Sequence, residues 1–304
     1  MAESVGTANL TAFCHVADSL KIACMTKVID RSDLKDIRLP HGNLTKRRVL
    51  ELFAEFFCLR TNSAAPLLRG RPITESDARS VRRTLSILHR DGFLYRVPHF
   101  DFGRERGGAG YVYGLSAKGV SHALRNGYST PATKTLDEHS IRTLDHELEL
   151  TSFHIALHRL CARHELRYSW RQTDLKHTVH PDAFFYVADP ANPGKAFCYF
   201  LEIERAKLGN YRNGEPQILR KLRKYYEYFN STGCEKEWGF RQFRVVAVQR
   251  SDARREGLLR ALREKVCHRM FWLTTETAYR EDISGAIFMT PKDDAPVAFS
   301  FLTQ

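Results

Sequence analysis

The sequence has few cysteines and no spacing that would put them to structural use. Its seven cysteines are scattered over 304 residues, and no pair forms a CxxC motif. This pattern argues against a zinc cluster or a disulfide framework and predicts a protein of the reducing cytoplasm. No apolar run approaches the roughly 18 residues of a membrane-spanning helix. The apolar N-terminal stretch is interrupted by His15, Asp18 and Lys21, which argues against a signal peptide.

Acidic residues are in the minority. The chain has 47 Lys and Arg against 35 Asp and Glu, a formal net charge of +12, and this balance favours a polyanionic partner. The length is sufficient for two domains, each with its own core. We expect an N-terminal extension (1–43), a first domain (44–127), a polar linker (128–137) and a second domain (138–304).

The first domain has the order helix, helix, helix, hairpin, helix. Apolar residues within 49–56 mark the first helix, and a short helix follows near 63–68. Thr74 and Asp77 are spaced as a capping box for a third helix that ends near Gly92. Residues 93–97 and 111–115 then read as two strands around a glycine-rich loop. This is the order of a winged helix-turn-helix domain.

Arginines gather where such a domain contacts DNA. The third helix would enter the major groove and the loop would contact phosphate or the minor groove. A solvated arginine face, or a winged helix that binds protein, is the alternative. The expected DNA-binding residues are Arg79, Arg82 and Arg83 on the helix and Arg104 and Arg106 in the loop.

The second domain reads as a mixed α+β or α/β sheet with helices on both faces. We expect a helix over 138–164, a strand over 166–171, a hairpin over 184–203 and a helix over 216–229. A strand (243–248), a helix (254–266) and a strand (270–273) complete the order.

Three carboxylates cluster on the expected hairpin. Glu202 and Glu204 alternate along its second strand, so they project from one face, roughly 6–7 Å apart at about 3.3 Å rise per residue. Asp182 opens the partner strand. Carboxylates brought together in this way repel one another unless a cation neutralises them, and oxygen ligands suit Mg²⁺ or Mn²⁺. The alternative is a turn aspartate beside two solvated glutamates.

The order Pro181-Asp182…Glu202-Ile203-Glu204 resembles the PD-(D/E)xK nuclease pattern, with glutamate where that superfamily usually has lysine. Some members supply the lysine from the next helix. Here the helix over 216–229 has a buried stripe, and Lys221 lies at its edge, while Lys224 is turned further towards solvent. Lys221 is therefore the predicted catalytic lysine, although a lysine in such a place is often only a snorkelling structural residue.

The first helix of the second domain contributes supporting candidates. Nuclease-like folds often lend a glutamate from this helix to the metal, which makes Glu147 a candidate together with its neighbour His146. His154 and His158 are four residues apart, but Leu150 stands where an HExxH motif needs its second histidine. Packing or surface roles are the expectation for these two histidines.

Taken together, a series of landmarks resembles the replication-relaxation family, which includes MOBC-type relaxases of mobile elements. These landmarks are the winged helix, His146-Glu147, Pro181-Asp182, Glu202 to Arg205 and Lys221-Leu222…Tyr225. The resemblance covers roughly residues 44 to 275. It implies a restriction-endonuclease-like second domain and Mg²⁺-dependent nicking of double-stranded DNA at an origin of transfer or replication. It also implies conjugation coupling or secretion proteins as partners. By position, Asp182, Glu202, Glu204 and Lys221 would be catalytic, with the three carboxylates as metal ligands.

The chemistry expected here is water attack assisted by a metal ion. Common relaxases use a tyrosine nucleophile and a His-x-His metal site, and no His-x-His occurs in this sequence. The competing hypothesis is a replication or transcription regulator whose nuclease-like domain is a scaffold without activity. A restriction-type nuclease with the same site chemistry is a third.

Overall fold

A computed structural model describes residues 46–70, 72–99, 110–128, 135, 143–172, 178–191, 196–204, 211–212 and 215–299. The chain divides into two compact units between Ser152 and Phe153. We refer to the described parts as the N-terminal unit (46–152) and the C-terminal unit (153–299). The predicted extension (1–43) lies outside the described residues, as does most of the predicted linker (128–137).

The N-terminal unit combines short helices with a three-stranded antiparallel sheet of order β1-β3-β2. The predicted helices and hairpin are present, and β1 is an additional strand that pairs with β3. The elements are α3 (Lys46–Glu55), β1 (Cys58–Arg60), α4 (Thr61–Arg69), α5 (Glu75–Arg90), β2 (Leu94–His99), β3 (Gly110–Leu115) and α6 (Ala117–Arg125).

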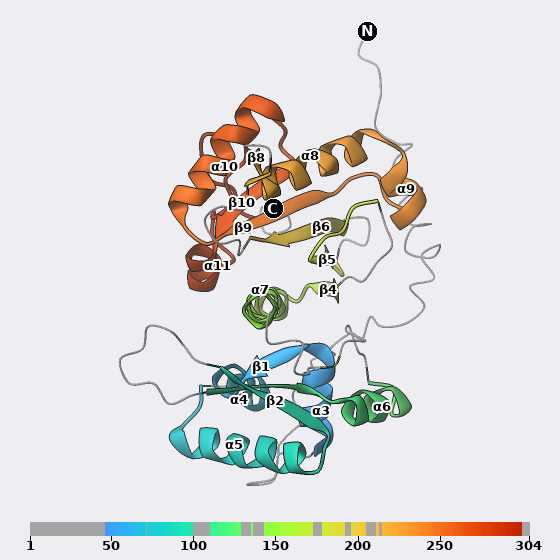
Figure 1. Cartoon of the computed structure of the whole chain (residues 1–304), viewed down its shortest axis with the longest axis vertical. Coiled ribbons are helices and arrows are strands. Elements are labelled where there is room, and N and C mark those ends of the chain that lie inside the picture. The colour runs from blue at the N-terminus through green and yellow to red at the C-terminus, as the bar shows by residue number, and fades with distance from the viewer. Residues whose placement is uncertain are drawn as a thin grey trace. The chain divides into compact units, whose positions relative to one another are not determined.

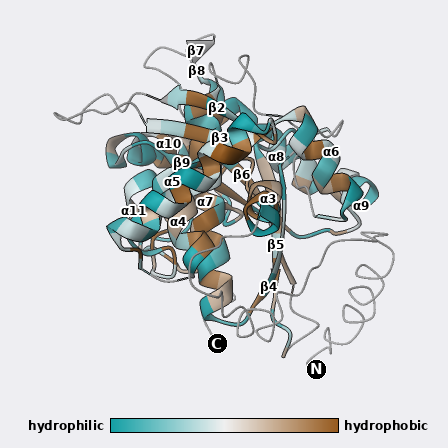
Figure 2. Cartoon of the chain, turned by 90° about the horizontal axis from the view of Figure 1, so that it is seen from below, coloured by the Kyte–Doolittle hydropathy of each residue, from teal (hydrophilic) through white to brown (hydrophobic). Residues whose placement is uncertain are grey.

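Helix α5 begins as the sequence predicts. The Thr74 side chain accepts a hydrogen bond from the Asp77 amide, and the Asp77 carboxylate accepts one from the Thr74 amide, so the capping box is confirmed. Its inner stripe is buried and its arginines face outward, because apolar residues recur at helical spacing. The same alternation of hydrophobic and hydrophilic residues is visible along α6 in Figure 2. The buried residues of α5 are Asp77, Ala78, Val81, Leu85 and Leu88.

The C-terminal unit is built on a mixed five-stranded sheet of order β10-β9-β6-β5-β4. The strands β4, β5 and β6 run antiparallel, whereas β9 and β10 run parallel to β6. The strands are β4 (Arg167–Gln172), β5 (Ala183–Ala188), β6 (Ala196–Ile203), β9 (Arg244–Gln249) and β10 (Phe271–Thr275), with the small pair β7 (Tyr211–Arg212) and β8 (Glu215–Pro216) outside the sheet.

Helices cover both faces of this sheet (Figure 1). One face packs against α8 (Gln217–Asn230), α9 (Gly233–Trp238) and α10 (Asp252–Lys265), around fully buried residues such as Phe200 and Leu222. On the other face, Phe153 of α7 (Leu144–Arg163) contacts two residues of the sheet, Trp170 of β4 and Phe185 of β5. It also contacts Tyr279 of α11 (Glu276–Asp282). The α8 face carries the site described below.

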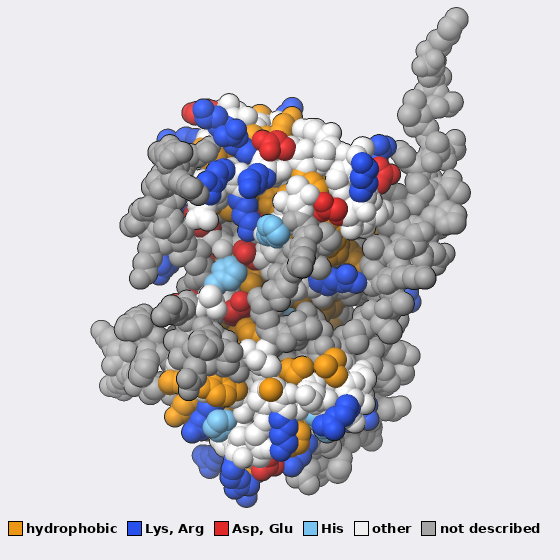
Figure 3. Space-filling model, turned by 45° about the vertical axis from the view of Figure 1, so that its right-hand side comes forward, with side chains coloured by type: hydrophobic (Ala, Val, Ile, Leu, Met, Phe, Trp, Pro, Cys, Tyr) orange, Lys and Arg blue, Asp and Glu red, His pale blue; other side chains and the backbone are white. Residues whose placement is uncertain are grey.

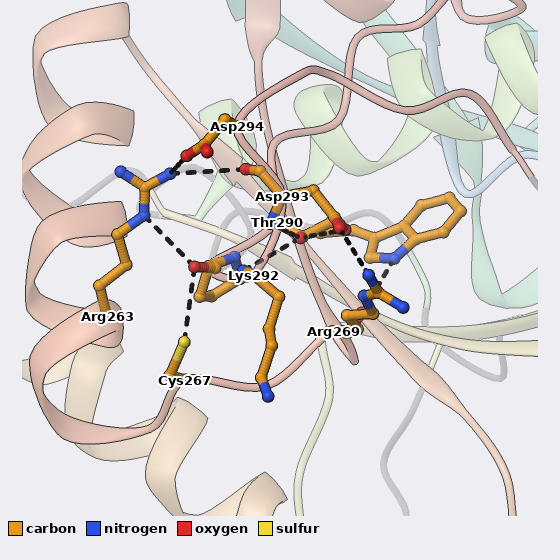
Figure 4. Close-up of polar contacts among 9 residues, drawn as sticks. Arg263, Cys267, Arg269, Thr290, Lys292, Asp293 and Asp294 are labelled. Carbon is orange, nitrogen blue, oxygen red and sulfur yellow. Dashed lines mark hydrogen bonds and ion pairs between the residues drawn. The ribbon is translucent and has the colours of Figure 1, made fainter.

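The segment after α11 is tied back onto α10 by polar contacts (Figure 4). Arg263 donates to the carbonyl oxygens of Pro291 and Asp293 and forms an ion pair with Asp294 at 3.3 Å. The Thr290 hydroxyl donates to the Asp293 carboxylate over 2.7 Å, and Arg269 pairs with the same carboxylate. These bonds fix the segment against the end of α10.

Among the described charged side chains visible in Figure 3, Lys and Arg (blue) are more prominent than Asp and Glu (red). On the C-terminal unit, α8 exposes Arg223 and Lys224, and α10 exposes Arg260, Arg263 and Lys265. Within the described ranges, the helices include none with the length and apolar character to cross a membrane.

Candidate active site

The site begins where β5 and β6 pair. Their antiparallel register places Ala183 opposite Leu201, so Asp182, the residue before β5, lies beside the end of β6. The Asp182 amide donates to the Leu201 carbonyl oxygen over 3.0 Å, and Oδ2 of Asp182 accepts a hydrogen bond of 2.8 Å from the Ile203 amide. Asp182 is thereby anchored to β6 through its backbone and one side-chain oxygen.

Glu202 lies on the neighbouring strand and is only 2 % exposed. Because strand residues alternate, Glu202 shares the α8 face with Phe200. Its Oε1 accepts a 2.5 Å hydrogen bond from the Tyr225 hydroxyl, and its Oε2 lies 2.5 Å from Nζ of Lys221. Both oxygens of this buried carboxylate therefore have partners from one helix.

Helix α8 supplies those partners because of its residue spacing. Lys221 and Tyr225 are four residues apart and so lie on the same side of the helix. The Tyr225 ring is fully buried, while the Lys221 side chain is 32 % exposed. Nζ of Lys221 also lies 3.7 Å from Oδ1 of Asp182. The structure thus brings together Asp182, Glu202 and Lys221 of the predicted site and adds Tyr225.

The electrostatics of the pair follow from burial and mutual attraction. Burial, and secondarily the charge of Asp182, raise the pKa of Glu202 to about 8, while Lys221 and Tyr225 act in the opposite direction. Burial lowers the pKa of Lys221, but Glu202 and Asp182 together outweigh it, so the net shift of the Lys221 pKa is upward. Lys221 is therefore a cation held between the carboxyl groups of Asp182 and Glu202.

Glu204 has different neighbours from Glu202. It is half-buried just after β6, where its amide donates to the Val248 carbonyl oxygen over 3.0 Å. Burial raises its pKa, whereas the charge of Arg254 and a hydrogen bond with Gln249 lower it. Among the described residues, no group of three or more His, Cys, Asp and Glu side chains is arranged to hold a metal ion. The close pair of carboxylates is Asp182 and Glu202.

The supporting candidates His146 and Glu147 lie in the first turns of α7 and belong to the N-terminal unit. Glu147 is buried, and it adds to the effect of burial in raising the pKa of the Cys58 thiol to about 12. In the C-terminal unit, Nε2 of His154 and Nδ1 of His158 lie 3.2 and 2.9 Å from the Tyr168 hydroxyl. These two histidines are part of the packing between α7 and β4.

The expected DNA-binding arginines divide into two sets. Arg79, Arg82 and Arg83 are exposed on α5, where Arg82 forms an ion pair with Glu75. Arg104 and Arg106 lie outside the described residues. The exposed face of α5 is therefore basic, although part of its charge is paired.

Comparison with known proteins gives a family for this architecture. The profile of the replication-relaxation family matches residues 58–242. The chain belongs to the replication-relaxation family. The family match includes Asp182, Glu202, Lys221 and Tyr225, and it ends before β9. No curated protein matches the chain.

Among solved structures, this family member is similar to the restriction endonuclease FokI. The match has 13 % sequence identity and a TM-score of 0.32, and it covers 77 % of this chain. The chain spans only 42 % of the matched FokI chain.

The tyrosine and glutamine contacts are the parts of the site that the sequence did not predict. Tyr225 belongs to the buried α8 stripe and to the landmarks of the family resemblance, four residues after Lys221, but neither pattern predicts its bond to Glu202. Gln249 ends a buried strand and has no motif of its own. Its link with Glu204 follows from the parallel register of β6 and β9, which places Ile203 opposite Val248.

Proposed function

We propose that the chain is a metal-dependent DNA endonuclease that nicks double-stranded DNA at an origin of transfer or replication. The observation that carries the proposal is the position of Lys221, between Asp182 and Glu202 at the end of the β5–β6 hairpin. Two carboxylates and a lysine are the groups that hydrolysis of a phosphodiester needs, and here the lysine comes from α8 because Glu204 occupies the usual lysine position.

The donor set fits a magnesium or manganese ion. Mg²⁺ is commonly bound through one or two carboxylates, and waters and substrate phosphates complete its coordination. Asp182 and Glu202 would hold the ion, each through an oxygen that faces Lys221. When bound, such an ion activates water and neutralises charge on the phosphate. Glu204 would position the end of β6 through its contact with Gln249.

Lys221 has the reach and the charge for the electrostatic part of the reaction. Its side chain is partly exposed, and its ammonium can donate hydrogen bonds to a phosphate oxygen or to the attacking water, which stabilises the negative charge that develops in the transition state. Removal of such a donor typically lowers the rate by about 10²–10³. Lys221→Met should therefore retain little nicking activity.

The N-terminal unit would select the DNA. Its helices α3, α4 and α5 and the β2–β3 hairpin follow the winged helix-turn-helix order, with α5 as the helix that enters the major groove. The exposed Arg79, Arg82 and Arg83 would contact phosphates or base edges. Coupling or secretion proteins of a conjugation system would be the partners if the DNA is an origin of transfer.

A second candidate function is supported by the same ion pair. Lys221 by itself neutralises the charge of Glu202, as expected of a DNA-binding regulator whose second domain is a scaffold. The two functions differ in one assay. Supercoiled plasmid carrying the cognate origin should become open circular with wild-type protein and Mg²⁺ or Mn²⁺ if the first is correct.

Matched variants assign the activity to the site. Asp182→Asn and Glu202→Gln keep size, remove the charge and replace one acceptor oxygen with an amide donor, and both should reduce nicking to background. Glu227→Gln changes an exposed glutamate of α8 and should nick like wild type. Wild-type binding without cleavage in either metal would favour the regulator, and equal nicking by Asp182→Asn would refute the site.

A further inference from the structure

The two carboxylates of the site share a pattern in how their oxygens are used. Oδ2 of Asp182 accepts from the Ile203 amide, and Oε1 of Glu202 accepts from the Tyr225 hydroxyl. The other oxygen of each, Oδ1 of Asp182 and Oε2 of Glu202, faces Nζ of Lys221. Each carboxylate therefore has one oxygen fixed by a neutral donor and one turned towards a cation.

Tyr225 is well placed to hold Oε1 of Glu202 in one position. A phenol has one O–H to donate, and Tyr225 directs it to Glu202 from a ring that is fully buried. The ring packs against Phe200 and Phe243, with centroid distances of 5.6 and 6.5 Å. Because the phenol cannot swing away without opening this core, Glu202 keeps one orientation.

Lys221 differs from Tyr225 in freedom. Its side chain is 32 % exposed and has four rotatable carbons, so its ammonium can withdraw towards solvent. Its ammonium lies at Oδ1 of Asp182 and Oε2 of Glu202, the oxygens that are not bound by the neutral donors. A divalent cation shared by the two carboxylates would bind at these same oxygens. Two cations at that point would repel each other.

We propose that Tyr225 is a positioning residue that fixes Oε1 of Glu202, so that Lys221 and a divalent cation exchange at Oε2 of Glu202 and Oδ1 of Asp182. The inference rests on the proposed function and adds to it the order in which the two cations occupy the site. Lys221 is the resident counter-ion of the site, and it leaves the carboxylates when the divalent ion binds. The released ammonium then lies beside the ion, where the phosphate would be.

Calorimetric titration of the full chain with Mn²⁺, without DNA, tests the exchange apart from activity. Lys221→Met removes the competing charge at similar volume and should bind Mn²⁺ about tenfold more tightly than wild type. Tyr225→Phe frees Oε1 and should bind Mn²⁺ about tenfold more weakly. The controls are Lys224→Met, an exposed lysine one turn along α8, and Tyr226→Phe, the half-buried neighbour; both should match wild type.

The outcomes separate this inference from the proposed function. If Tyr225 were only a packing residue, Tyr225→Phe would lower the thermal midpoint and leave Mn²⁺ affinity unchanged, which would overturn its positioning role. The exchange would be overturned if Lys221→Met bound Mn²⁺ no more tightly than wild type, or if neither protein bound Mn²⁺. Lys221→Gln is a second variant that guards against a folding defect in Lys221→Met. Nicking by wild type with unchanged affinity in Lys221→Met would refute the exchange alone, whereas tighter binding without any nicking would refute the proposed function alone.

Discussion

At the scale of single residues, two polar side chains of the C-terminal unit are held by partners that fix their direction. Glu202 is the clearest case, since a carboxylate that is 2 % exposed is tolerable only with donors on its oxygens. The half-buried His268 is the second, because its Nδ1 accepts a hydrogen bond from the Met270 amide over 3.2 Å. An accepting nitrogen must be unprotonated. The fold therefore selects a particular protonation state at His268.

His268 should make stability depend on pH. Burial, and secondarily the charge of Lys292, lower the pKa of His268 below 6.5. The unfolded chain then binds a proton more readily than the folded one, so this contribution is present above pH 6.5 and is lost as the pH falls through that value towards the folded pKa. His268→Asn keeps an acceptor for the Met270 amide but does not titrate. The free energy of unfolding, measured at pH 8 and pH 5, should fall less in His268→Asn than in wild type.

An equal fall in both proteins would show that other groups carry the acid sensitivity. His164→Asn is the matched control, since His164 is an exposed histidine of the same unit, and it should keep the wild-type difference between the two pH values.

At the scale of elements, hydrophobic periodicity predicted the helices that contain an apolar repeat and missed the short helices α9 and α11 and the short strand β1. The stripe of α8 was sufficient to place Lys221 at the border of the core, and the capping box fixed the start of α5. The strand β1 has only three residues, and it begins within the apolar run Phe56-Phe57-Cys58-Leu59, so its sequence does not distinguish a strand from a helix end. α9 and α11 are six and seven residues long and also lack a repeat. The bond from Tyr225 to Glu202 joins residues 23 apart in sequence, and such pairings depend on the packing of α8 on the sheet.

The capping box of α5 gives a test at this scale. Thr74→Ala removes the acceptor for the Asp77 amide and should destabilise the start of α5 by about 1 kcal/mol. Hydrogen exchange of the first-turn amides should report this as faster opening. Ser76→Ala changes an exposed residue of the same turn and should stay within about 0.5 kcal/mol of wild type. Unchanged exchange in Thr74→Ala would mean that the ion pair between Arg69 and Asp77 holds the turn without the cap.

At the scale of the whole molecule, the two proposed activities, DNA cleavage and DNA selection, are assigned to two units with separate cores. Cleavage chemistry is assigned to the C-terminal unit, where Asp182, Glu202 and Lys221 meet. DNA selection is assigned to the N-terminal unit, whose α5 exposes basic side chains. A division of this kind predicts that each property can be altered without the other, because substitutions at independent sites act additively.

Replacement of Arg79, Arg82 and Arg83 by alanine tests the division. The buried stripe of α5 is untouched, so the fold should survive, since exposed substitutions usually cost little stability. Affinity for a fixed duplex should fall, and the slope of log affinity against log salt should flatten by about 0.9 for each phosphate that the variant no longer neutralises. Mn²⁺ binding should equal that of wild type. The charge-matched control replaces three exposed residues of the C-terminal unit, Lys236, Arg260 and Lys265.

The salt series decides between a local interaction and a general effect of charge. If α5 is the recognition helix, the α5 triple variant binds more weakly at every salt concentration, and the control is weakened much less, because long-range attraction is screened beyond about 10 Å at 0.1 M salt. Equal weakening in both variants would indicate binding by net charge alone. Wild-type affinity and slope in the α5 variant would refute α5 as the recognition helix and assign DNA binding to Arg104 and Arg106 or to the basic helices of the C-terminal unit.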